Sequence, residues 1–203
     1  MKAILALFLT IMMMFIMIAP GQSARAQLKP PKEIVEEFWK LEVEGSRLTP
    51  QGWLTTAGFF VHPIPPSLQE PLVVVAKDFG VSQAKLDGKH ADVLVFDREL
   101  GSIVVPRLQF KRPAAPPAGL PRVIKTARQY HLVLTNRYSQ VQSDGKTKEV
   151  EGPLEWRLEE CPVEILVSLD TAIRYVTEMR DKTTDPMIKK NADETLMKLK
   201  KLH

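Results

Sequence analysis

The residues best suited to chemistry in this chain are an acid, a base and a phenol on two candidate strands. Asp92 lies in one alternating segment, and the neighbours Tyr130 and His131 open another. A histidine oriented by a carboxylate is a common general base, and either group can abstract a proton from inside an apolar pocket. Asp78 is a second candidate partner for His131. The alternative interpretation is a cross-strand surface pair without a catalytic role.

Aromatic side chains form a second candidate site. The sequence suggests a ligand pocket lined by Trp53, Phe59, Phe60 and Trp156. Aromatic rings line many small-ligand pockets, but they also fill hydrophobic cores, and the pattern leaves both interpretations open. His62, in the proline-rich segment that follows, is either a base at this pocket or an ordinary loop histidine.

The common metal and nucleophile signatures are missing from the sequence. His62, His90 and His131 have no short-spaced ligand partners, and the chain contains no HExxH, CxxC, P-loop or GxSxG motif. We therefore expect no bound metal and no cofactor. Cys161 is the only cysteine, which rules out a disulfide within the chain. It is interpreted as a small buried hydrophobe, with an intermolecular disulfide or a reactive thiol as alternatives.

The N-terminus has the three parts of a secretory signal peptide. Met1-Lys2 is a positive start, residues 3–19 are an uncharged apolar run, and Ala24-Arg25-Ala26 is an A-x-A cleavage site. We expect residues 1–26 to be removed and the protein to be exported, to the periplasm or the medium. An uncleaved anchor is the alternative, but the apolar run is at the lower limit for a spanning helix, and we expect no membrane span in the mature chain.

Composition limits the class of the mature protein. Residues 27–203 carry 26 basic and 24 acidic side chains, a net charge of +2, which gives no global field that would attract nucleic acid. We therefore expect no nucleic-acid partner. The remaining 177 residues predict one domain, long enough to bury a hydrophobic core of its own.

Periodicity predicts helices at both ends and strands between them. An amphipathic helix is expected at 32–44, with Ile34, Phe38 and Leu41 on its apolar face, and a short one follows Thr49-Pro50. The predicted strands cover 72–76, 81–86, 91–96, 103–110, 130–141 and 154–159, with a turn at Leu100-Gly101, a surface loop at 111–121 and a hairpin turn at Asp144-Gly145. Two further helices are expected from Pro162 and from Pro186. The order predicts an α+β fold: N-terminal helices on a curved antiparallel sheet, then a C-terminal helical hairpin.

Three of these segments together resemble the nuclear transport factor two-like superfamily, whose cone-shaped α+β fold also occurs in ketosteroid isomerase. They are the opening helix IVEEFWKLEVEG with LTPQGW, the strand segment HADVLVFDRELGSI, and the hairpin YHLVLTNRYSQVQSDGKTKEVEGPLEWRL. The resemblance covers about residues 31–160. It implies a curved sheet around the first helix and an apolar pocket between them. It does not select a function, because the superfamily contains enzymes, ligand binders and interaction modules.

The sequence therefore predicts a signal peptide at 1–26, a cone-like domain at 27–160 and a helical extension at 161–203. The leading hypothesis is a non-catalytic exported module that binds a small apolar ligand or a protein partner, with a homodimer as an open expectation. The first alternative is an isomerase- or dehydratase-type enzyme using Asp92, His131 and Tyr130. The second is an envelope-associated protein whose last helix binds anionic surfaces through Lys189, Lys190, Lys198, Lys200 and Lys201.

Overall fold

The computed structural model describes residues 28–64, 72–113, 125–142 and 144–202. The predicted signal peptide and most of the predicted 111–121 loop lie outside these residues. The elements, in chain order, are α2 (Pro31–Val43), the 3-10 turn η1 (Ser46–Leu48), α3 (Pro50–Ala57), β1 (Leu72–Val81), β2 (Lys85–Asp87), β3 (His90–Val104), β4 (Gln109–Lys111), β5 (Lys125–Val141), β6 (Thr147–Leu158), β7 (Ile165–Ser168), α4 (Leu169–Lys182) and α5 (Pro186–Lys200). The α+β class predicted from the sequence is confirmed.

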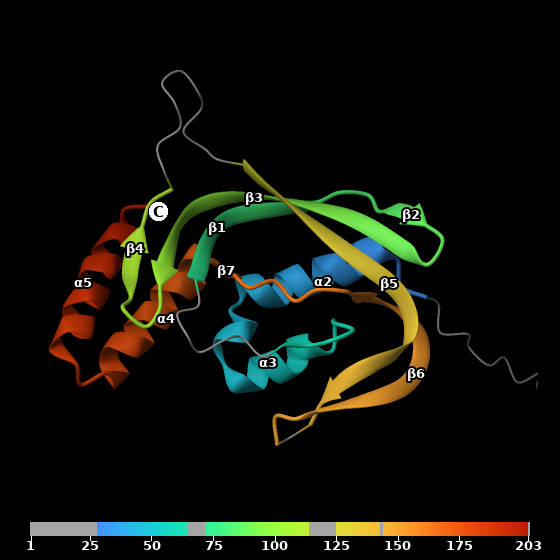
Figure 1. Ribbon diagram of the computed structural model, residues 1–203. Coiled ribbons are helices and arrows are strands. Elements are labelled where there is room, and N and C mark those ends of the chain that lie inside the picture. The colour runs from blue at the N-terminus through green and yellow to red at the C-terminus, as the bar shows by residue number, and fades with distance from the viewer. Residues whose placement is uncertain (1–27, 65–71, 114–124, 143, 203) are drawn as a thin grey trace, which may run out of the picture.

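A curved sheet arches over α2, and the β5–β6 hairpin curls down beside α3 (Figure 1). The strand order is β6-β5-β3-β1-β7, with the short strands β2 and β4 also paired to β3. All pairs are antiparallel except β1 with β7, which run parallel. The predicted all-antiparallel sheet was therefore wrong in this one pair, and the sheet is mixed.

Both N-terminal helices begin where the sequence indicates. Pro31 and Pro50 occupy the first turns, where a missing N–H costs nothing, and the Thr49 hydroxyl accepts a hydrogen bond from Gly52 N–H at 3.1 Å. The apolar face of α2 is rotated from the predicted one. It buries Val35, Phe38, Trp39 and Glu42, whereas Ile34 and Leu41 lie at its margin. The inward face of this helix therefore carries a carboxylate.

The middle strands are longer than predicted. β1 continues to Val81, so the expected strand over 81–86 was wrong and only β2 remains of it. The turn expected at Leu100-Gly101 was also wrong, because β3 runs straight through Gly101. A Cβ at Gly101 would lie 2.3 Å from the Phe110 ring, so the glycine is required by the close approach of β4 rather than by a turn. The chain turns instead at 105–108, through a cis Val105–Pro106 bond.

The hairpin predicted at Asp144-Gly145 is confirmed, and Gly145 takes the left-handed conformation with φ of +80°.

The prediction that a helix begins at Pro162 was wrong. Residues 161–164 are irregular, and Ile165–Ser168 form the strand β7. The helix starts at Leu169, where the Ser168 hydroxyl accepts the N–H of Thr171 at 3.2 Å. The apolar spacing of Leu166, Leu169 and Ile173 had suggested one continuous helix.

Two hydrophobic cores lie on this sheet. The first, named here the aromatic core, joins α2 and α3 to β3, β5 and β6; its large rings are Phe38, Trp39, Trp53, Phe60, Tyr130 and Trp156. The second, the aliphatic core, packs α4 and α5 on β1, β4 and β7; it includes Val73, Val75, Ile103, Leu108, Ile165, Val167, Val176, Leu196 and Leu199. The segment after residue 160 thus supplies both a strand of the common sheet and half of a core.

Candidate functional site

The predicted acid, base and phenol are divided between the two faces of the sheet. Asp92 and His131 are cross-strand partners, with Asp92 Oδ1 2.7 Å from His131 Nδ1, and both side chains are about half exposed. The hydrogen bond from His131 holds the pKa of Asp92 below its ordinary value. Tyr130, which precedes His131 in the strand, points to the opposite face and is only 6% exposed. Burial raises the pKa of its phenol. Asp78 is instead paired with Arg98.

The Asp92–His131 pair therefore lacks the surroundings that a proton-abstracting site requires. Such a site raises the basicity of its carboxylate by removing water, whereas the pKa of Asp92 is lowered and the pair faces solvent. The buried Tyr130 cannot join it from the other face. This arrangement corresponds to the cross-strand surface pair, the alternative interpretation of the sequence.

The four predicted pocket aromatics have two different positions. Trp53 and Phe60 are buried and stacked, with ring centroids 6.3 Å apart, and Phe60 also meets Phe38 edge to face. These two rings belong to the core. Phe59 and Trp156 lie at the edge of the same core and line a surface groove. The sequence signal thus identified both core and groove residues without separating them.

The groove lies between the start of α2, the end of α3 and the outer part of β6. Its volume is about 350 Å³, and its apolar lining comes from Leu28, Ile34, Phe59, Pro153, Leu154 and Trp156. Lys29 and Glu37 form an ion pair of 2.8 Å at its rim, where Glu155 also lies. Leu154 is 54% exposed, although it is a large apolar side chain on a strand. The sequence pattern missed Leu154 and Ile34 because neither is aromatic.

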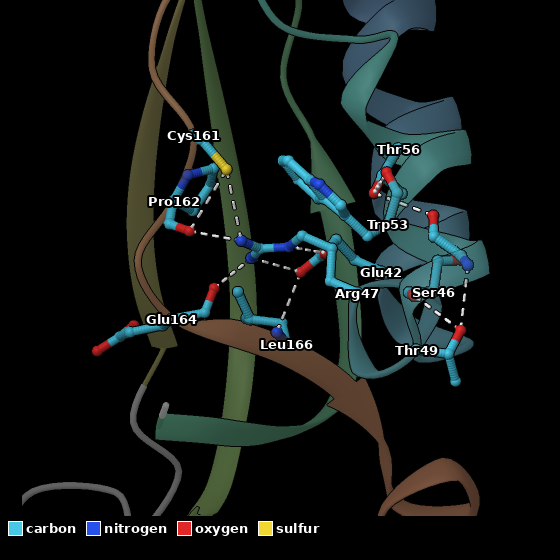
Figure 2. Close-up of polar contacts among 11 residues, drawn as sticks. Glu42, Ser46, Arg47, Thr49, Trp53, Thr56, Cys161, Pro162, Glu164 and Leu166 are labelled. Atoms are coloured by element: carbon cyan, nitrogen blue, oxygen red, sulfur yellow. Dashed lines mark hydrogen bonds and ion pairs between the residues drawn. The ribbon is translucent and has the colours of Figure 1, made fainter. Parts of the chain in front are cut away.

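A buried ion pair ties α2 to the segment that leads into β7 (Figure 2). Arg47 and Glu42 are both excluded from solvent, and two hydrogen bonds of 2.5 and 2.9 Å join them. Arg47 also donates to the carbonyls of Pro162 and Glu164 and to the Cys161 sulfur, while Glu42 accepts the N–H of Leu166 at 3.2 Å. Every nitrogen of the guanidinium is thereby engaged, as a buried charge requires.

Burial acts to lower the pKa of Arg47, but the hydrogen bonds and charge of Glu42 outweigh it and raise that pKa above its ordinary value. Local geometry places the guanidinium: Gly45, with φ of +83°, ends α2 and turns the chain so that Arg47 points inward. The sequence did offer a signal for this pair. Glu42 stands at the position i+7 from Val35 on the apolar stripe, where an unpaired carboxylate would be costly.

Cys161 lies beside this ion pair. Its sulfur is 3.6 Å from Arg47 Nη1, and it is a free, partly buried thiol. Burial raises the pKa of the thiol, and this effect exceeds the opposing one of Arg47. The thiol is therefore protonated at neutral pH and poorly suited to be a nucleophile. Of the two interpretations of Cys161, the small buried side chain fits this position better than the reactive thiol.

A second charged cluster lies on the inward face of the sheet. Arg128 donates to Asp97 at 3.2 Å and to Glu164 at 2.6 Å. The Asp97 side chain is fully buried, and burial raises its pKa above the ordinary value of 3.8. Burial likewise raises the pKa of the nearby Glu99. One arginine thus stands among three carboxylates.

The remaining predicted sites are less organised. The five lysines of the last helix are exposed, but Asp193 and Glu194 are exposed among them, which reduces the positive charge of the surface. His62 and His90 are exposed and contact Ser139 and Glu159. Among the residues that the structure describes, no three side chains are arranged to hold a metal ion, and no helix has the length and apolarity to cross a bilayer.

No protein family model matches this chain, and no curated protein matches it either. The resemblance to the nuclear transport factor two-like superfamily therefore stays a prediction, and the function has to be argued from the geometry of this chain alone.

Proposed function

We propose that the protein is an exported, non-catalytic module that binds a small apolar ligand in the groove between α2, α3 and β6. One observation carries the proposal: Ile34 of α2, Phe59 in the turn after α3, and Leu154 and Trp156 of β6 converge on one groove. Its volume of about 350 Å³ lies within the usual range of small-molecule sites. Apolar side chains make up most of the lining, and its charged residues, Lys29, Glu37 and Glu155, are partly exposed to solvent, which favours an uncharged or amphipathic occupant.

The groove is backed by the packed aromatic core. Phe59 packs against Phe38, with ring centroids 5.9 Å apart, and Phe38 is fully buried in the aromatic core. A ligand in the groove would therefore meet a surface that is already ordered, which reduces the entropy cost of binding. The enzymatic alternative has less support, because its residues lie on opposite faces of the sheet and its acid–base pair is exposed.

The test is native against denaturing mass spectrometry of residues 27–203, purified from the medium or envelope of the host organism. We expect a reproducible extra mass in the native spectrum that disappears on denaturation. Leu154→Lys should remove the extra mass, because it places a charge on the apolar wall without disturbing the core. Leu86→Lys is the matched control, since Leu86 is a 62% exposed strand leucine outside the groove. Retention of the extra mass by Leu154→Lys, or its absence from the parent chain, would contradict the proposal.

A further inference from the structure

The first part of β5 is a strand edge without a partner. β5 pairs with β3 from Lys125 onward, but its ladder with β6 starts only at Leu132. Among the described residues, Lys125–His131 therefore have a neighbouring strand on one side only. In Figure 1 the start of β5 lies over β3, whereas the chain that leaves β6 passes beneath the sheet into β7.

The last rung of the β6 ladder shows which backbone groups face the free side. The N–H of Glu159 donates to the carbonyl of His131 at 2.9 Å. Because N–H and C=O groups point to opposite sides at successive residues, the groups of Gln129 and Ala127 face the same side as those of His131. This edge thus offers a row of donors and acceptors at the spacing that an extended chain requires.

A cleft borders this edge because the chain after β6 is held away from it. Residues 160–164 turn toward β7, and Arg47 fixes them there through the carbonyls of Pro162 and Glu164. The cleft between the two segments has a volume of about 480 Å³ and is lined by residues 128–131 and 160–164. Arg47 is itself held by the buried Glu42, so the cleft is a built feature and not a frayed strand end.

We propose that this cleft binds an extended peptide segment of a partner protein, which adds to β5 as an antiparallel strand in the place that β6 leaves open. Main-chain hydrogen bonds to Gln129 and Ala127 would provide most of the affinity, as in other cases of strand addition. The site shares no lining residue with the apolar groove, so this inference does not depend on the proposed small ligand.

The charges of the cleft favour a basic peptide. Arg128 is already paired with Glu164, and His131 with Asp92. Glu160 is exposed at the lip and has no ion pair with any residue that the structure describes. The unbalanced charge of the cleft is therefore negative, and a lysine or arginine of the peptide opposite Glu160 would complement it.

A second copy of the chain fits the cleft less well. Each β5 edge lies recessed beside its own 160–164 segment, which hinders the antiparallel pairing of two such edges. A single extended peptide does not meet this obstacle.

The test is amide hydrogen exchange of residues 27–203 with two probe peptides. The first alternates valine and lysine over seven residues, and the second has glutamate in place of lysine. We expect the amides of Ala127 and Gln129 to exchange rapidly in the free chain. At ten times the dissociation constant of the lysine peptide they should exchange roughly tenfold more slowly, because only the free fraction exchanges. The glutamate peptide should give little protection.

Two variants make the test specific. Gln129→Pro removes the N–H that faces the cleft and should abolish protection of Ala127, while proline remains tolerated on a free edge. Glu160→Lys leaves the edge intact and should reverse the preference between the two peptides. The proposal is overturned if neither peptide protects these amides, or if Gln129→Pro binds the lysine peptide as the parent does. Slow exchange of the Ala127 and Gln129 amides in the absence of peptide would also overturn the proposal. If this protection increases with protein concentration, the occupant of the cleft is a second copy of the chain.

Discussion

The two cores of this protein differ in chemistry as well as in position. The aliphatic core is built from branched side chains, and the polar groups that it buries are satisfied: the hydroxyl of Thr195 donates to Leu108 and accepts the N–H of Phe110. The aromatic core contains large rings, a buried ion pair, and an indole N–H of Trp53 that has no hydrogen-bond partner within the described structure. Both the groove and the β5 cleft border the aromatic core.

This contrast suggests a division of roles. Aliphatic side chains interdigitate closely and carry no polar atoms that need hydrogen-bond partners, so burying them stabilises the fold without a desolvation cost for polar groups. Rings and buried charges are harder to pack and to satisfy, and they form walls that end at the surface. We infer that the aliphatic core stabilises the sheet while the aromatic core also forms walls of the groove and of the β5 cleft.

The largest expected effect comes from breaking the buried ion pair. Glu42→Ala should lower the free energy of unfolding by about 3–5 kcal/mol, because it leaves the Arg47 charge buried and uncompensated. Urea unfolding measures this loss. The double variant Glu42→Leu/Arg47→Met should recover part of it, since it removes both charges but leaves the carbonyls of Pro162 and Glu164 and the N–H of Leu166 without these partners. The pair would have a different role if Glu42→Ala had the same free energy of unfolding as the parent, or if the double variant were less stable than Glu42→Ala.

A comparable truncation in the aliphatic core should affect stability alone. Leu199 is fully buried, and Leu199→Ala should cost about 2–5 kcal/mol through lost contacts and a cavity. The extra mass in native mass spectrometry should be retained. Met197→Ala, at a 59% exposed position of the same helix, is the control. Loss of the ligand from the folded Leu199→Ala variant would mean that the two cores do not have separate roles.

A smaller effect, visible as pH dependence, is expected at the charged border of the aromatic core. Burial raises the pKa of Asp97 above 3.8 in the folded chain, so the folded state binds this proton more tightly than the unfolded state. The contribution of Asp97 to stability is therefore present below pH 3.8 and is lost as the pH rises through the folded pKa. As the pH rises from 3.8 through the folded pKa of Asp97, the free energy of unfolding of Asp97→Asn should increase relative to that of the parent. A stability difference between the two proteins that does not change with pH would contradict this assignment.

The smallest effect is expected at the exposed acid–base pair. Asp92→Asn and His131→Gln should leave the unfolding midpoint and the retained ligand essentially unchanged, because both side chains face solvent and exposed pairs contribute little. Thermal unfolding and native mass spectrometry of the two variants measure this. Loss of the ligand from either variant would move the binding site to the outer face of the sheet.

Local patterns predicted several elements correctly. Pro31, Thr49-Pro50, and Asp144-Gly145 set the starts of two helices and a hairpin through interactions within a few residues, so they could be identified without the rest of the chain. The errors share one cause. Gly101 resembles a turn residue until β4 packs on it, and residues 165–168 resemble a helix until β1 offers a parallel partner.

The candidate sites show the same limit. Phe59 and Trp156 could be named as pocket residues from their type, and Asp92 with His131 as a pair from the alternation of two strands. Whether each faced solvent, a core or a groove depended on the curvature and register of the sheet. Arg47 could not be assigned to residues 161–164 from the sequence, because these contacts join segments more than a hundred residues apart.

The sequence by itself determined the α+β class, the hairpin and the chemical types available for a site, because these follow from local propensity and periodicity. Only the tertiary structure decided that Tyr130 and His131 face apart, that Leu154 joins Phe59 and Trp156 in one groove, and that β5 keeps a free edge. Each of these depends on which distant segment lies beside a strand. Packing between such segments is set by the whole fold and not by any local pattern.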